Sequence, residues 1–120
     1  MDVLLIRHAE SANNALWARD RDAFTTGRTH DPPLTELGFE QADVLARHLA
    51  ERGARIDRLV ASPMLRAIQT ARPVAAALGV PLEVWVEVHE RGGIYVGDPA
   101  TGEGFVAHPG LSRSVSTLLR

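Results

Sequence analysis

The chain has 120 residues, 45% hydrophobic and 23% charged, which is typical of one globular domain and unlike a disordered protein. A net charge of −2 gives no basic surface for nucleic acid or an anionic membrane, and no apolar run is long enough to span a bilayer. The absence of cysteine excludes disulfides, thiolate metal sites and cysteine catalysis, and it suits the cytoplasm, where we expect the protein to be located.

A short apolar run opens the chain and ends at two polar residues. Residues 3–6 fit a buried strand, because all four are apolar and two are β-branched. Arg7 and His8 follow, so they would lie at the carboxyl edge of a sheet, where open α/β folds bind ligands. Arginine there offers planar donors to phosphate oxygens, and a neutral histidine is a nucleophile. The alternative is that this pair is only the solvated start of a loop.

The next stretch predicts little regular structure and then a clear helix. Residues 15–19 favour a helical turn, and residues 24–27 are typical of a loop. Residues 36–52 form an amphipathic pattern that begins after Thr35, a good N-terminal cap, and ends at Gly53.

A second strand and helix follow. Residues 56–61 include a short apolar strand, and Ser62 and Pro63 are typical of a helix start. We expect this helix to continue to about Leu78, with Pro73 either kinking it or ending it early.

The last regular elements complete an alternating order. Gly79 should stop the second long helix, and residues 82–86 predict a third strand with alternating faces. Strands that alternate with helices of this length indicate parallel strands joined by crossover helices, the α/β class. Residues 92–110 are rich in glycine and proline and therefore favour turns.

Four segments carry motifs, and these are residues 5–14, 31–38, 61–71 and 88–95. The first contains LIRHAES, the second PLTELG and the third SPMLRAIQTA. Their residues and their order resemble those of the histidine phosphatase superfamily, which contains the cofactor-dependent phosphoglycerate mutases and many small phosphatases. Ala9 stands where the family usually has glycine, a change that keeps the residue small.

The resemblance implies an activity and assigns roles to five residues. His8 would attack a phosphomonoester and form a phosphohistidine, while Glu90 would protonate the departing alcohol. Arg7, Asn14 and Arg66 would bind the phosphate oxygens. Arginine supplies the charge that magnesium supplies in other phosphoryl-transfer enzymes, so neither a metal nor a cofactor is expected.

Some of these assignments have competitors. Glu87 lies three residues before Glu90 and could be the acid, although the strand pattern around it favours exposure to solvent. Arg66 could be an ordinary surface charge on a helix. The family uses a second histidine later in the fold, but here only His108 follows, next to Pro109 and after a glycine-rich stretch, which favours a loop histidine.

The resemblance also implies a fold and its extent. The family fold is a three-layer α/β sandwich with a mainly parallel sheet, and residues 1–120 would form one incomplete domain, the front half of it. An uncovered edge strand would then favour a homo-oligomer. The implied function is hydrolysis of a small phosphorylated substrate. A mutase-type phosphotransferase and a catalytically weak, phosphate-binding remnant are the alternatives.

Overall fold

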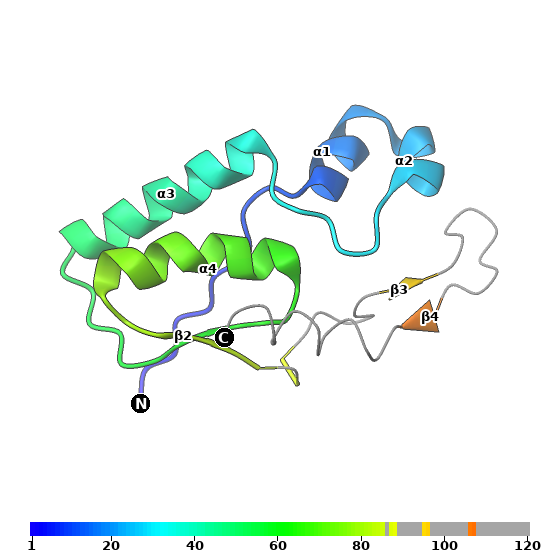
Figure 1. Cartoon of the computed structure of the whole chain (residues 1–120). Helices are drawn as coiled ribbons and strands as arrows, with labels where there is room; N and C mark the ends of the chain where they lie inside the picture. The colour runs from blue at the N-terminus through cyan, green and yellow to red at the C-terminus, as the bar shows by residue number, and fades with distance from the viewer. Residues whose placement is uncertain (86, 89–94, 97–105, 108–120) are drawn as a thin grey trace.

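The computed structural model describes residues 1–85, 87–88, 95–96 and 106–107, which form helices and short strands (Figure 1). In chain order, the helices are α1 (Ala12–Arg19), α2 (Arg21–Gly27), α3 (Glu36–Glu51) and α4 (Leu65–Leu78). The strands are β1 (Leu59–Ala61), β2 (Leu82–Val84), β3 (Tyr95–Val96) and β4 (Val106–Ala107). None of the helices within these described ranges is long and apolar enough to cross a membrane.

The centre of the described structure is a β-α-β unit. Strands β1 and β2 pair in parallel, with Leu59 opposite Leu82 and Ala61 opposite Val84, and α4 connects them. Helix α4 packs on this pair of strands, and α3 lies beside α4 (Figure 1). The parallel pairing and crossover helix predicted from the alternating pattern are therefore confirmed for the second and third predicted strands. Strands β3 and β4 form a separate antiparallel pair.

Small side chains let the layers approach closely. One cluster of buried residues joins α3 to α4 through Ala46, Leu49 and Val74. A second joins α4 to β1 through Ala61, Ile68 and Ala71. Because alanine adds little bulk at these contacts, the helix backbones lie near one another and near the sheet.

The ends of the long helices follow the sequence signals. The Thr35 side chain accepts a hydrogen bond from the Gly38 N–H at 3.0 Å, which caps the start of α3. Gly53 and Gly79 follow α3 and α4 with φ of 63° and 65°, a region that favours glycine. Pro73 lies inside α4, so the helix does not end there.

The apolar run at the start of the chain departs from prediction. Residues 3–6 form no strand, and Val3, Leu4 and Leu5 are 68%, 62% and 89% exposed. A strand exists only where a neighbouring backbone pairs with it, and the two ladders within the described residues, β1 with β2 and β3 with β4, do not include this segment. Figure 1 shows this segment passing α4 and the sheet without joining it.

Two other boundaries were predicted wrongly. Residues 24–27 belong to helix α2, because the Asp20 carboxylate accepts the N–H groups of Asp22 and Ala23 and starts a helix there. The Phe24 ring then packs edge-on against Trp17, with 5.1 Å between ring centroids. Strand β2 ends at Val84, before the predicted end.

We predict that Gly38→Ala destabilises the protein by about 3 kcal/mol or more, because overpacking a tight contact displaces backbone. A Cβ at Gly38 would lie 2.1 Å from the Glu10 carbonyl oxygen. The matched control is Gly27→Ala, whose Cβ would meet only the Leu16 side chain at 3.4 Å and should change stability by less than about 1 kcal/mol. Chemical denaturation of both variants measures the difference, and equal losses would contradict the close contact.

Candidate active site

The backbone that follows His8 is fixed by pairing with the segment before α3. The Thr35 N–H donates to the Glu10 carbonyl at 3.0 Å, and Ser11 forms an antiparallel bridge with Leu34. The Glu10 N–H donates to the side-chain oxygen of Gln41 at 2.9 Å. His8 therefore precedes a stretch of chain that has little freedom to move.

The His8 ring is oriented by the next residue. Its Nδ1 lies 2.6 Å from the Ala9 carbonyl oxygen, and His8 is half-buried. A carbonyl oxygen only accepts hydrogen bonds, so Nδ1 carries the proton in this arrangement. In the neutral ring, the other nitrogen, Nε2, then bears the lone pair that a nucleophile needs.

A buried hydroxyl joins the His8 segment to helix α4. The Ala9 N–H donates to Thr70 Oγ1 at 3.0 Å, and this hydroxyl donates to the Arg66 carbonyl at 2.7 Å. Thr70 thus connects the backbone beside His8 with the turn of α4 that carries Arg66.

Asn14 is fixed in the first turn of α1 by a reciprocal cap. Its Oδ1 accepts hydrogen bonds from the Ser11 N–H at 3.0 Å and the Ser11 hydroxyl at 2.8 Å, while the Asn14 N–H donates to Ser11 Oγ. The hydrogen bonds found among the described residues leave the Asn14 Nδ2 group unused, so this group can donate to an anion.

The start of α4 differs from the prediction. The helix begins at Leu65, and Met64, at the capping position, makes no side-chain cap. The Leu65 N–H donates instead to the Asp31 carboxylate at 2.9 Å, so the cap comes from a distant loop and not from Ser62. Arg66 lies in the first turn, as its motif predicts.

The Asp31 carboxyl, next to the first turn of α4, also has a shifted pKa. Burial raises the pKa of its carboxyl above the ordinary value of 3.8, because desolvation disfavours the charged form. The hydrogen bond from Leu65 and the charge of Arg66 act in the opposite direction but are smaller.

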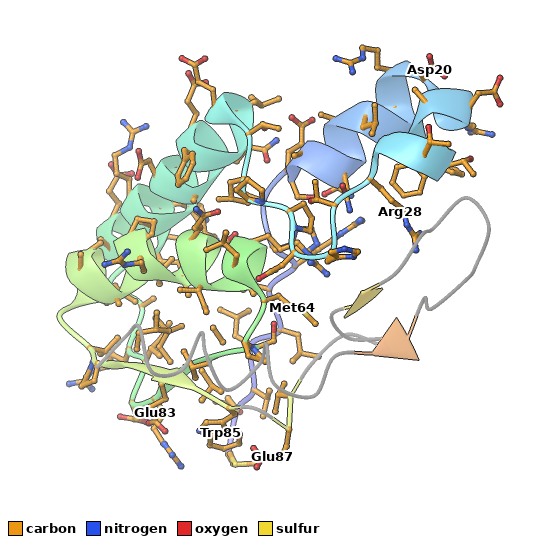
Figure 2. All side chains as sticks on the ribbon, turned by 45° about the vertical axis from the view of Figure 1, so that its right-hand side comes forward. Asp20, Arg28, Met64, Glu83, Trp85 and Glu87 are labelled. Carbon is orange, nitrogen blue, oxygen red and sulfur yellow. The ribbon has the colours of Figure 1, made fainter. Side chains whose placement is uncertain are left out.

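Three of the proposed site residues line one cavity of about 380 Å³. Arg7, His8 and Arg66 line it together with Ser62 and with apolar residues of β1 and α4. Figure 2 shows Met64, which is also in the lining, near the start of α4. Arg7 and Arg66 thus place two positive charges at the cavity that the His8 imidazole also lines.

The remaining proposed residues are not part of this cavity. Asn14 does not line it, and Glu90 and His108 lie outside the described residues. Glu87 is exposed, as its position predicted, and Figure 2 shows it near Trp85, on the side away from α3 and α4. Within the described ranges, no three His, Asp or Glu residues are grouped so as to hold a metal ion.

Sequence reasoning missed Asp31 and Thr70. Both residues lie inside the motif segments, but each acts through a contact with a residue more than 30 positions away. The sequence gives no signal for the Asp31 contact, because Ser62 and Pro63 are themselves typical of a helix start and the uncapped Met64 emerges only in the structure.

Comparison with known proteins places this arrangement in a family. A model of the histidine phosphatase superfamily (branch 1) matches residues 3–101. The chain belongs to this superfamily. The fold agrees, since the chain superposes on the protein histidine phosphatase SixA, solved with tungstate, with a TM-score of 0.51 and 30% identity over 68% of this chain and 47% of that one.

Two curated relatives extend the comparison. A phosphoglycerate mutase-like protein of Arabidopsis thaliana is 38% identical over 69 residues, 56% of this chain and 26% of the relative. A 2,3-bisphosphoglycerate-dependent phosphoglycerate mutase of Sinorhizobium fredii is 38% identical over 77 residues, 64% of this chain and 33% of the relative. This histidine phosphatase superfamily chain therefore spans about a quarter to a third of these relatives.

The raised pKa of Asp31 predicts a pH dependence of folding. A carboxyl whose folded pKa lies above its unfolded value of 3.8 contributes stability below that pH, and this contribution is lost as the pH rises through the folded pKa. Asp31→Asn keeps an acceptor for Leu65 and cannot ionise. The melting temperature of the wild type should therefore fall relative to Asp31→Asn as the pH rises from 3.

Thermal unfolding between pH 3 and pH 7 checks this, with Asp57→Asn, at an exposed aspartate, as the control for general charge effects. A wild type that gains stability over Asp31→Asn as the pH rises would show that Arg66 and Leu65 outweigh burial.

Proposed function

We propose that this chain is a phosphomonoester hydrolase that acts through a phosphohistidine on His8. The observation that carries the proposal is the cavity in which Arg7, His8 and Arg66 meet, with His8 Nδ1 bonded to the Ala9 carbonyl. This bond leaves Nε2 as the nucleophilic nitrogen, and the arginines supply the charge that a phosphoryl group requires.

In the first step, the Nε2 lone pair attacks phosphorus while the bond from phosphorus to the alcohol oxygen breaks. Arg7 and Arg66, which line the cavity with His8, stabilise the non-bridging oxygens. Glu90, in its protonated form, gives its proton to the departing alcohol.

In the second step, water attacks the phosphorus and the phosphorus–Nε2 bond breaks. The Glu90 carboxylate takes the proton from this water, so inorganic phosphate leaves and both groups return to their starting states. Charge neutralisation by arginine allows these steps without a metal.

The relatives include both phosphatases and mutases, which pass the phosphoryl group to different acceptors. SixA is named as a protein histidine phosphatase, and the Sinorhizobium relative is named as a mutase. Hydrolysis is favoured because the basic residues in the lining, Arg7, His8 and Arg66, all serve the one phosphoryl group of the proposed mechanism. A weakly active remnant is the remaining alternative, since the chain spans only part of its relatives.

The test is the rate of phosphate release from 4-nitrophenyl phosphate. His8→Ala should lose at least about 1,000-fold in kcat, because the nucleophile is removed. Arg66→Ala should lose roughly 100-fold, and Arg66→Lys less, because lysine keeps the charge but not the planar donors.

Two matched controls accompany these variants. Arg72→Ala removes an exposed arginine from the same helix, and His48→Ala removes an exposed histidine from α3. Both should retain wild-type rates. Full activity in His8→Ala would refute the proposal, and transfer to an added alcohol in place of hydrolysis would favour the mutase-type alternative.

A further inference from the structure

Thr70 is one of only two polar side chains that are buried in the described part of the chain. The other, Ser11, caps α1 with Asn14 and needs no further explanation. Thr70 is 6% exposed and its hydroxyl makes two hydrogen bonds, to the Arg66 carbonyl at 2.7 Å and from the Ala9 N–H at 3.0 Å.

The direction of these bonds is fixed by their partners. The Arg66 carbonyl can only accept, so the Thr70 O–H points to it, and a lone pair of Oγ1 receives the Ala9 N–H. A threonine that bonds the carbonyl four residues earlier is common in helices and needs no function. The bond from Ala9 is different, because it joins α4 to a backbone 61 residues away in sequence.

The two peptide groups around Ala9 are each held by one side chain. Thr70 accepts a hydrogen bond from the Ala9 N–H, in the peptide between His8 and Ala9. Gln41 accepts one from the Glu10 N–H, in the next peptide, and the carbonyl of that same peptide, which belongs to Ala9, accepts from His8 Nδ1. Of these two side chains only Thr70 also bonds the backbone of Arg66.

We propose that Thr70 is a positioning residue, which ties the His8–Ala9 backbone to the Arg66 turn and so keeps His8 Nε2 directed at the phosphate site. This inference rests on the proposed function of the same site. Without the hydroxyl, the Ala9 N–H loses its partner and the backbone beside it can rotate. The Nδ1 bond then weakens, and the imidazole is free to adopt the tautomer in which Nε2 carries the proton.

The test compares Thr70→Val, which keeps the shape and removes the hydroxyl, with Thr70→Ser, which keeps the hydroxyl. Ile68→Val removes a methylene group from a buried position on the same helix, outside the cavity lining, and is the control for lost stability. With 4-nitrophenyl phosphate, Thr70→Val should lower kcat roughly 10- to 100-fold, because small misplacements of reacting groups are costly. KM should change by less than about two-fold, since the arginines that bind phosphate remain.

Thr70→Ser should restore most of kcat, and Ile68→Val should stay near the wild type. A second readout does not depend on turnover. The ¹⁵N chemical shifts of the His8 ring, assigned by comparison with His8→Ala, should show protonated Nδ1 in the wild type and in Thr70→Ser. In Thr70→Val they should move toward a mixture of tautomers.

Equal losses in Thr70→Val and Thr70→Ser, or in Thr70→Val and Ile68→Val, would overturn the inference. Unchanged ring shifts in Thr70→Val would also overturn it. If the wild type itself releases no phosphate, the proposed function fails separately, and the ring shifts alone decide whether Thr70 positions His8.

Discussion

The close approach of the Glu10 carbonyl to Gly38 is the contact on which the site depends. Gly38 has no side chain, so the start of α3 can lie directly against the backbone just after His8. The Thr35 N–H bonds the same carbonyl, and Thr35 also caps α3, so one residue fixes both the helix and the His8 segment. A larger residue at position 38 would move this whole contact and with it the backbone that follows His8.

The electrostatics of the site follow from how α4 begins. The N-terminus of a helix attracts anions, but here the first N–H is already occupied by the chain's own Asp31 carboxylate. In the proposed site, the positive field for a phosphate would therefore come mainly from side chains. Arg66 lies in the first turn of α4 and Arg7 lies in the N-terminal segment, so two separate parts of the chain supply charge to one cavity.

Sequence reasoning predicted what local patterns encode and missed what distant contacts create. The start of α3 at Thr35 and the stop of α4 at Gly79 are local signals, and both were read correctly. The motif placed Arg66 in the first turn of α4, but no pattern shows that Thr70 bonds the Ala9 N–H or that Asp31 caps α4. The strand predicted for residues 3–6 is absent for the same reason, because an apolar run becomes a strand only when another strand pairs with it.

The most direct test of the account is the intact mass of the chain after brief incubation with a phosphomonoester, quenched in alkali, which preserves phosphohistidine. We expect one added phosphoryl group on the wild type, located by fragmentation on His8 and absent from His8→Ala. It would be contradicted by a wild type that releases phosphate without any adduct, or by an adduct that persists in His8→Ala.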